Sequence, residues 1–371
     1  MAVTVLSGAE DSTKNTDNNP RDIAPVELLE PSAAPLTYLM SKMGKDPAGN
    51  PKVEWLENEA MPRYTTLSAS AASNATSFGV TADIFRVGDV VRFTSAGFAV
   101  LITATAAGSV SGTKVGGTAQ ASAASSAEVF IVSNSNAEGA TLREIRYPQL
   151  VTASNYCQII RTPVGLTETE QATKHYSGDE RRRLQKEAGI EHARALDQTF
   201  FFGARDITGT QRLCGGLKEF ISTNVTNDSG GTTEAEWQTF LKSGFRYGSR
   251  RKVAFCSPAA IAALEGYARS NIKVESSQSH GETYGIEMST YVSGQGRVDL
   301  INQVHWQDST VYGGYVFLVD MDAVKMRPLR DTRLKENVQA PDYDGFKDEY
   351  ITEVSLQVTH ERRHALLTGV S

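Results

Sequence analysis

His360, Glu361 and His364 form a pattern in this sequence that matches a catalytic motif. The spacing H-E-x-x-H is typical of zinc hydrolases, in which one helix face carries both histidines and the glutamate activates the zinc-bound water. Here an alternating, strand-like segment runs directly into His360, and the seven residues after His364 leave no place for a third ligand downstream. We therefore expect a charged β-turn at 360–364 and no metal site.

Cysteine chemistry is a second possibility, and Cys256 is the best placed of the three cysteines. It lies between a predicted strand and the amino terminus of a predicted helix, where a thiolate would be stabilised. No histidine is near it in the sequence, so we interpret Cys256 as a buried core residue. Cys157 and Cys214 are far from it and no C-x-x-C pair occurs, which favours a reducing cytoplasm over a disulfide framework or a structural zinc site.

Other motifs of catalysis and cofactor binding are missing. The sequence has no G-x-x-x-x-G-K-[ST] phosphate loop, no G-x-G-x-x-G after a strand and no G-x-S-x-G elbow. Its six histidines are scattered without an evident serine or cysteine partner. We predict no catalytic, cofactor-binding or metal-binding residues and no cofactor. Because catalytic residues can meet from distant positions, a soluble cytoplasmic hydrolase stays open as an alternative.

Composition limits the class of protein further. The chain has 371 residues, a formal net charge of −6 and 40% hydrophobic residues, which is enough for two or three domains with a proper core. No apolar run approaches the roughly 20 residues that span a bilayer, and the amino terminus lacks the basic and apolar regions of a signal peptide. The negative net charge disfavours strong binding of nucleic acid. We expect a large soluble product of the cytoplasm.

The first 63 residues predict extended chain instead of a compact domain. Residues 1–22 are almost wholly polar and cannot bury enough apolar surface to order alone. Residues 23–63 contain six prolines, which prevent long regular structure. Between the prolines we predict a short helix at 36–43, ended by Gly44, and a strand at 52–57.

Residues 65–140 have a different composition, with seven charges in 76 residues and mostly Ala, Ser, Thr, Gly and Val elsewhere. Three runs at 89–93, 98–103 and 128–132 have the β-branched and aromatic content of strands, and glycines separate them. We predict a small all-β insert.

The strongest helix signal covers 177–203. Ser177 and Glu180 fit a capping box, and Gly203 supplies the stop. Only Leu184, Ala188, Ala195 and Phe202 form an apolar stripe, which is narrow for a globular surface helix. Either charge pairs hold a solvated helix here, or the sides of the helix meet other subunits. The arginines at 181–183 lie where the helix dipole disfavours cations, so we expect an acidic partner near them.

Residues 233–329 predict a separate α/β unit. A second capping box at Thr233 opens a helix that ends at Gly244, and Ser257-Pro258 opens another. We predict strands at 252–256, 297–302, 304–306 and 315–319. The alternation in 350–359 predicts a half-buried antiparallel strand, with which 365–370 could pair.

The succession of these parts resembles the major capsid proteins of tailed bacteriophages (Caudoviricetes) with the HK97 fold, in the subgroup with a β-rich insertion in the extended loop. The stretches that carry the resemblance are NPKVEWLENEAMPRYT, FRVGDVVRF, SSAEVFIVSNSNAEGA, SGDERRRLQKEAGIEHARALDQTFFFG, KVAFCSPAAIAALEGYA, YVFLVDMDAVKMRPLR and YITEVSLQVTHERRHALLTGVS. The match in order covers nearly the whole chain, and its specificity lies in the succession.

The resemblance implies an α+β fold with five parts. These are an N-terminal arm (1–48), an extended loop (49–64 and 141–164), the inserted small β domain (65–140), a peripheral domain (165–232 and 330–371) with a spine helix (177–203), and an α/β axial domain (233–329).

The resemblance also implies a structural protein and no enzyme. Subunits would self-assemble into hexamers and pentamers of an icosahedral head around double-stranded DNA, so that the protein would be found in the virion after synthesis in the host bacterium. The implied partners are the protein itself, then portal, scaffolding and decoration proteins and a weak, non-specific contact with DNA, but no membrane. Some relatives crosslink a loop lysine to an asparagine; Lys45, Lys52 and Lys114 match no such chemistry, so we predict none. The arm is too short for a built-in scaffolding segment. A tail or decoration protein of the same virion is the remaining alternative.

Overall fold

The computed structural model divides the chain into two compact units. Met1–Trp55 and Ala153–Ser371 belong to the first, and Leu56–Thr152 form the second. The residues that the structure describes are 35–42, 45–72, 75–93, 99–115, 122–174, 178–228, 232–271, 275–276, 289–306 and 312–370. Ser177, Gly44, Phe98 and most of the predicted arm therefore lie outside the described residues.

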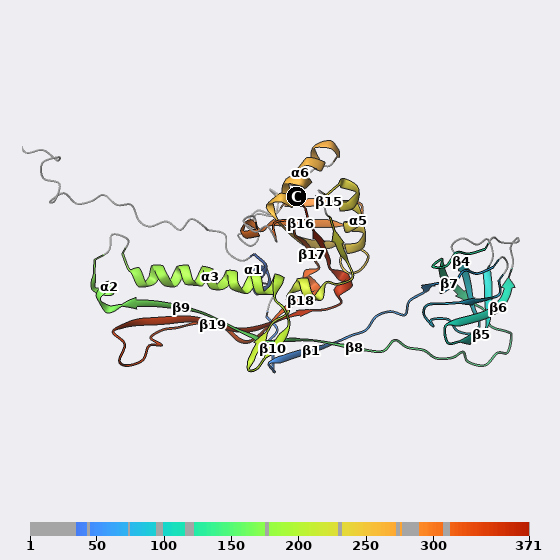
Figure 1. The fold of residues 1–371 in the computed structure, drawn as a ribbon, viewed down its shortest axis with the longest axis horizontal. Coiled ribbons are helices and arrows are strands. Elements are labelled where there is room, and N and C mark those ends of the chain that lie inside the picture. Colours follow the sequence, from blue (N-terminus) through green and yellow to red (C-terminus); the bar gives the residue numbers. More distant parts are fainter. Residues whose placement is uncertain are drawn as a thin grey trace, which may run out of the picture. The chain divides into compact units, whose positions relative to one another are not determined.

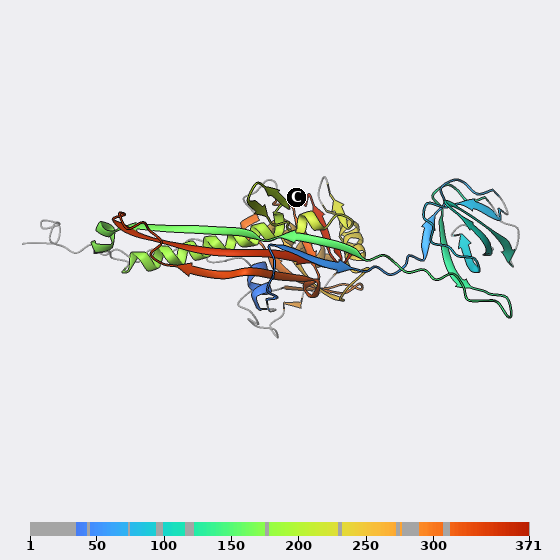
Figure 2. The same ribbon diagram turned by 90° about the horizontal axis from the view of Figure 1, so that it is seen from below.

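In the first unit the long helix α3 (Glu180–Phe202) lies along a three-stranded antiparallel sheet, as Figures 1 and 2 show. The strands follow the order β18-β19-β9, with bounds β18 Val324–Lys335, β19 Gly345–Val358 and β9 Gln158–Thr167. Asp348 and Thr352 of β19 both bond to side chains of α3. Since side chains alternate along a strand, Glu349 and Glu353 lie on the opposite face of the sheet.

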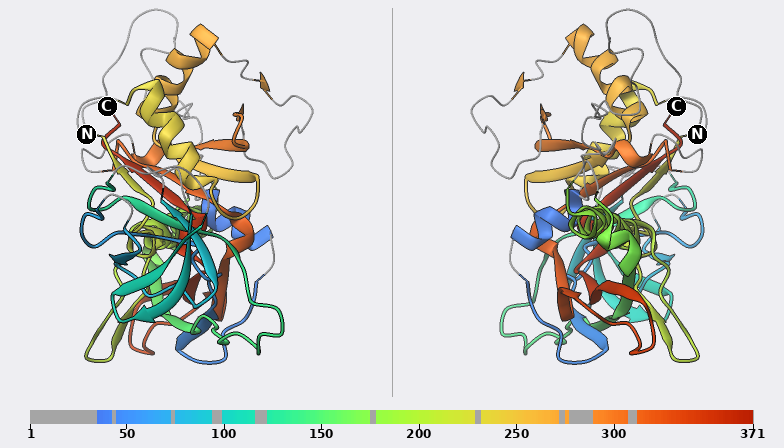
Figure 3. Two further views of the ribbon diagram at one scale, coloured as in Figure 1. Left: turned by 90° about the vertical axis from the view of Figure 1, so that its right-hand side faces the viewer. Right: turned by 90° about the vertical axis from the view of Figure 1, so that its left-hand side faces the viewer.

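A seven-stranded mixed sheet forms the second layer of this unit, in the order β12-β20-β17-β13-β16-β15-β14. Its strands are β12 Val225–Asn227, β20 Ala365–Thr368, β17 Val316–Val319, β13 Arg251–Cys256, β16 Arg297–Asn302, β15 Ser289–Val292 and β14 Glu275–Ser276. Helices α5 (Glu234–Gly244) and α6 (Pro258–Asn271) cover one face of this sheet (Figure 3), because Trp237 and Ala260 share a core with Ala254 of β13. Phe255, the next residue of β13, packs on the other side against Phe201 of α3.

Short elements connect these layers. They are α1 Pro35–Lys42, β1 Lys52–Glu57, β8 Val151–Tyr156, α2 Glu168–Ala172, β10 Asp206–Thr208, β11 Gln211–Leu213, α4 Leu217–Phe220, and the one-turn 3-10 helices η2 Val304–Trp306, η3 Met321–Ala323 and η4 Glu361–Arg363. β1 pairs with β8, and β10 pairs with β11 as a hairpin.

The second unit contains a six-stranded sheet in the order β2-β7-β4-β5-β6-β3. Its strands are β2 Tyr64–Thr66, β7 Glu128–Asn134, β4 Asp89–Phe93, β5 Ala99–Ala106, β6 Ser109–Val115 and β3 Ser77–Gly79. Phe78, Phe93 and Val129 lie in its own buried core, with the two phenylalanine rings edge to face at 4.8 Å. The predicted strands at 89–93, 98–103 and 128–132 correspond to β4, β5 and β7 in their described residues.

Several local predictions are confirmed. The helix at 36–43 and the strand at 52–57 correspond to α1 and β1. Thr233 and Glu236 form the capping box of α5, and the hydroxyl of Ser257 accepts a hydrogen bond from the amide of Ala260 at the start of α6. Gly203 ends α3, where a Cβ atom would lie 2.3 Å from the carbonyl oxygen of Cys214, a distance that only glycine allows.

The start of α3 differs from its prediction. Asp179 is the N-cap, and its carboxylate accepts hydrogen bonds from the amides of Arg181 and Arg182. The N-cap therefore lies two residues after the predicted cap Ser177, and the helix begins at Glu180, because an aspartate satisfies the free amides as well as a serine does.

The buried stripe of α3 also differs. Ala188 is buried as predicted, but Leu184, Ala195 and Phe202 are only half-buried. The other buried residues of α3 are His192, Leu196, Asp197, Phe200 and Phe201. Polar residues enter this stripe because distant parts of the chain supply their hydrogen-bond partners.

Three strand predictions were wrong or incomplete. Residues 304–306 form η2 instead of a strand, and β18 was not predicted as a strand. β20 does not pair with β19; it pairs with β17 and β12 and thereby joins the seven-stranded sheet. The turn η4 directs the chain from one sheet to the other, so the two C-terminal strands belong to different layers.

Candidate assembly surfaces

The histidines of the H-E-x-x-H pattern have structural surroundings. His364 is fully buried, its Nδ1 accepts a hydrogen bond from the amide of Asp320 at 3.2 Å, and burial lowers its pKa to about 3. The carboxylate of Glu361 accepts hydrogen bonds from Ser222 and Thr223. The pattern lies in the turn η4, in agreement with the predicted charged turn. The hydrogen bonds of Glu361 connect this turn to the segment after α4. Across the described ranges, no group of three or more His, Cys, Asp or Glu residues could hold a metal ion.

The three cysteines are free and buried. Burial raises the pKa of Cys256 to about 12, that of Cys214 to about 12 and that of Cys157 to about 11. Thiolates are therefore disfavoured at all three positions, which agrees with the interpretation of Cys256 as a core residue.

His192 connects α3 to two strands at once. Its Nδ1 lies 3.0 Å from the hydroxyl of Thr162 in β9, and its Nε2 lies 2.7 Å from the hydroxyl of Thr352 in β19. Burial lowers the pKa of this imidazole, which favours the neutral form. A neutral imidazole with both nitrogens satisfied fixes the register between helix and sheet.

Asp197, five residues further along α3, anchors α1. One carboxylate oxygen accepts a hydrogen bond from the amide of Thr37 at 3.1 Å, and the other accepts one from the side chain of Gln303 at 3.2 Å. Burial raises the pKa of Asp197 to about 7 in spite of these hydrogen bonds. The described part of the predicted arm is thereby tied to the long helix, where Leu36 also joins the aromatic core.

The arginines at the start of α3 are bound within the same chain. Arg181 donates two hydrogen bonds, of 2.8 and 2.7 Å, to the buried carboxylate of Asp348. Burial acts to raise the pKa of Asp348, but the hydrogen bonds from Arg181 and its neighbours outweigh it and hold that pKa below its usual value. Arg183 bonds to Glu180 and Glu187. The acidic partner expected near these arginines therefore exists within the chain: for Arg181 it is Asp348 of β19.

Arg182 is the exception among these three arginines. Its side chain is 85% exposed, and its Nε forms an ion pair with the half-exposed carboxylate of Asp179 at 3.2 Å. Arg181 and Arg183 thus have acidic partners within the chain, and a contact of these three arginines with a neighbouring subunit stays a prediction, with Arg182 the most exposed of them.

The face of the three-stranded sheet opposite α3 carries ion pairs around two buried carboxylates. Glu349 pairs with Arg161 and Lys335, and Glu353 pairs with Arg212 and Arg330. Each carboxylate is nearly inaccessible, while the cations around it are partly exposed. This arrangement explains how a strand as charged as β18 joins the sheet.

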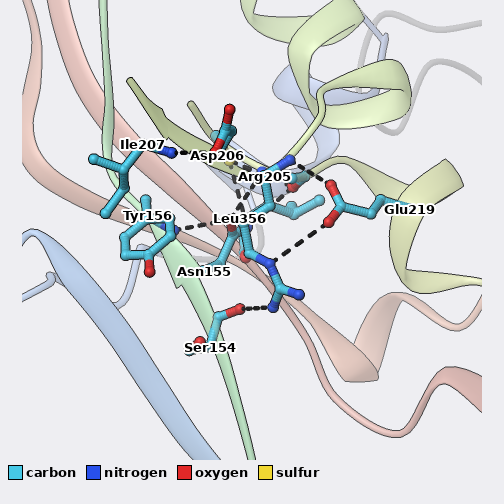
Figure 4. A network of polar contacts seen from close by, with 10 residues as sticks. Ser154, Asn155, Tyr156, Arg205, Asp206, Ile207, Glu219 and Leu356 are labelled. Atoms are coloured by element: carbon cyan, nitrogen blue, oxygen red, sulfur yellow. Dashed lines mark hydrogen bonds and ion pairs between the residues drawn. The ribbon is translucent and has the colours of Figure 1, made fainter. Parts of the chain in front are cut away.

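A polar network fixes β8 to the body of the first unit, as Figure 4 shows. The fully buried Asn155 donates to the carbonyl oxygens of Gly215 and Leu356 at 3.0 and 2.7 Å, and it accepts from the amide of Gly215 at 2.8 Å. Beside it, Arg205 donates to the carbonyl oxygen of Ser154 and pairs with Glu219. No local pattern in the sequence predicts this network, because Asn155 lies 60 and 201 residues from Gly215 and Leu356, and Ser154 lies 51 residues from Arg205.

The segment that precedes β8 exposes large apolar side chains in the second unit. Leu142, Ile145 and Tyr147 are 86%, 74% and 83% exposed, and Leu150 and Val151 are more than half exposed. Between them, Arg143 pairs with Asp89, and Arg146 donates to the carbonyl oxygens of Asp83 and Phe85. The arginines hold the segment on the unit while the apolar side chains point to solvent. We call this exposed set, Leu142, Ile145, Tyr147, Leu150 and Val151, the apolar strip.

Comparisons with known proteins agree with this architecture. The structure resembles the capsid asymmetric unit of cyanophage A-1(L) with a TM-score of 0.56 and 9% identity, over 97% of this chain and 99% of that chain. It resembles the capsid of a native GTA particle with a TM-score of 0.54 and 9% identity, over 98% and 100% of the two chains. A chain of Microbacterium phage Oxtober96 matches with a TM-score of 0.52 and 13% identity, over 96% and 98%. A search of curated proteins found no match.

These likenesses place the chain in a class: it has the HK97-like fold of viral capsid proteins, with mixed α and β structure. Residues 12–371 match the family described as SU10 major capsid protein, and the chain belongs to that family. It is a structural protein of the phage capsid, found in the virion, and not an enzyme. The hydrolase alternative is thereby excluded. None of the helices in the described ranges is both long and apolar enough to cross a membrane.

Proposed function

We propose that this major capsid protein assembles into hexamers and pentamers that close into an icosahedral head around double-stranded DNA. The observation that carries the proposal is the apolar strip. Exposed apolar patches of this kind mark interaction sites, and burying five large side chains against a second subunit would offset the entropy of ordering them.

The second unit supports the division of the chain that the sequence suggested. Residues 56–152 have their own core, and β1 and β8 connect them with the rest of the chain. We propose that 65–140 is an inserted domain within an extended loop (49–64 and 141–164), that 1–48 is an arm, that 165–232 with 330–371 is the peripheral domain, and that 233–329 is the axial domain. The peripheral segments then contribute β12 and β20 to the sheet of the axial domain.

Partners other than the protein itself are part of the proposal. Portal, scaffolding and decoration proteins are expected partners of a head of this class. The net charge of −6 favours only weak, non-specific contact with the enclosed DNA, because tight binding of phosphates requires many cations to release counterions.

The experiment that tests the proposal removes the apolar strip without touching the arginines between its members. In the variant Leu142→Ser/Ile145→Ser/Leu150→Ser we expect soluble subunits that sediment slowly and form no shells in electron micrographs. A matched control, Val87→Ser/Val115→Ser/Val292→Ser, changes three exposed valines outside the strip and should still give shells. Normal shells from the first variant would contradict the proposed role of the strip.

A further inference from the structure

The second unit contains a pocket whose lining combines arginines with apolar side chains. The cavity has a volume of about 320 Å³ and lies beside the ends of β4 and β7. Its polar lining includes Arg63, Arg86, Arg143 and Asp89. The apolar part of its lining is formed by Met61, Pro62, Ile84, Ile131 and Val132.

The charge of the pocket is positive. Asp89, the acidic residue of the lining, is almost fully buried and already accepts hydrogen bonds from the guanidinium of Arg143 at 2.6 Å and from the amide of Arg86 at 2.8 Å. The lining thus contains three guanidinium groups and one carboxylate, and that carboxylate is already paired. Two positive charges of the pocket have no negative charge in the lining to balance them.

Several guanidinium donors of the pocket lack a good acceptor. The Nε of Arg143 is buried and has no hydrogen-bond partner among the described residues. One nitrogen of Arg86 faces the thioether sulfur of Met61 at 3.5 Å, and sulfur is a weak acceptor. The side chain of Arg63 is exposed, and no hydrogen bond or ion pair of its guanidinium is found in the described part of the chain. A buried donor without a partner is costly, so an acceptor bound there would be stabilised.

We propose that this pocket binds a carboxylate that is carried on an apolar stem. Arginine pairs with carboxylates through charge-assisted, bidentate hydrogen bonds, and the apolar lining suits the stem. Inorganic phosphate fits less well, because it has no apolar stem to fill the part of the pocket that Met61, Ile84 and Ile131 line. The carboxylate could come from a free acid or from an acidic side chain on another polypeptide, and both sources present the same chemistry.

The test uses the purified full-length protein and ligand-observed NMR with three small probes: hexanoate, its neutral analogue hexanamide, and inorganic phosphate. We expect binding of hexanoate and none of hexanamide. Phosphate that binds at least as tightly as hexanoate, or hexanamide that binds equally well, would overturn the proposal. So would a lack of binding by every carboxylate probe.

A peptide arm distinguishes the two sources. Acetyl-Leu-Glu-Leu-amide is compared with its Gln counterpart; binding of the Glu peptide more tightly than hexanoate indicates a polypeptide source, and the reverse indicates a free acid. Either result supports the carboxylate site.

Variants connect the binding to the pocket. Arg63→Gln should weaken carboxylate binding about tenfold, as expected for the loss of a charge-assisted hydrogen bond, without affecting the fold, because its side chain is exposed. Arg143→Lys should keep a positive charge near Asp89 but remove the Nε donor, and should also weaken binding. Arg92→Gln, an exposed arginine of β4 outside the pocket, is the matched control. Equal affinities of Arg63→Gln and Arg92→Gln would contradict the assignment.

Discussion

From its amino-terminal end to its middle α3 contacts the three-stranded sheet through Arg181 and His192, whereas at its carboxyl-terminal end it enters an aromatic cluster through Phe200 and Phe201. Phe201 lies 4.9 to 5.1 Å, between ring centroids, from Phe255, Trp306 and Phe317. The polar contacts are directional, so they specify one register of helix on sheet. The aromatic contacts bury more apolar surface but depend less on angle, so they contribute more of the stability.

The largest effect should come from the aromatic end. Phe201→Ala removes a fully buried ring and should lower the free energy of unfolding by about 3–5 kcal/mol. Urea denaturation of unassembled subunits, followed by circular dichroism, measures this change. Tyr343→Ala, at a partly exposed ring of the same unit, is the control and should cost far less. If both variants lose the same stability, the aromatic end is not the stronger anchor.

The polar end should respond to the loss of one partner more than to the loss of both. Arg181→Met leaves the buried carboxylate of Asp348 without its cation, and we expect a loss of about 2–3 kcal/mol, below the full cost for a buried pair because Arg181 is partly exposed. Arg181→Met/Asp348→Met removes both charges and should recover part of that loss in the same urea measurement. A double variant less stable than the single one would show that the ion pair itself stabilises the fold.

A fall in pH should change the local stability around His192 and around Asp197 in opposite directions. The folded pKa of His192 is lowered, so its contribution is complete above the unfolded pKa of 6.5 and is lost as the pH falls below it. The folded pKa of Asp197 is raised from 3.8 to about 7, so its contribution is complete below 3.8 and is lost as the pH rises through 7.

Hydrogen exchange at pH 5 and pH 8, corrected for intrinsic rates, measures this difference. At pH 5 we expect lower protection near His192 and higher protection near Asp197 and α1. The substitutions His192→Gln and Asp197→Asn should each remove the pH dependence at their own end. Parallel changes at both ends would refute the separation.

The smallest effect on stability should come from Arg182→Glu. The side chain is exposed, and an anion suits the amino terminus of a helix, so the urea midpoint should stay nearly unchanged. Assembly is the informative measurement here: a salt-dependent loss of shells with an unchanged midpoint would identify Arg182 as a contact between subunits. Arg181→Glu is unsuitable for this purpose because it breaks the ion pair within the chain.

Local signals predicted much of the fold. Capping residues located α5 and α6, and the alternation of apolar residues located β19, because these features depend on neighbours in the sequence. The β-branched runs likewise located β4, β5 and β7 in a segment of low complexity.

Features that depend on distant partners were not predicted. β18 contains Pro328 and several cations, and it is a strand because Glu349 and Glu353 of the neighbouring strand pair with those cations. His192 is buried because Thr162 and Thr352 complete its hydrogen bonds, so the apolar stripe drawn from sequence alone missed it. The Asn155 network likewise shows no local pattern.

The position of β20 has a consequence for the timing of folding. β20 lies between β17 and β12 in the seven-stranded sheet, yet it follows both of them in the sequence by 46 and 138 residues, counted from Val319 and Asn227 to Ala365. A ribosome must therefore finish nearly all of the strands before β12 can be joined to β17 through β20. Until then β12 has no neighbour on that side, and a nascent chain cannot present the completed unit to other subunits. The order of synthesis therefore makes the closure of the seven-stranded sheet a late event in folding.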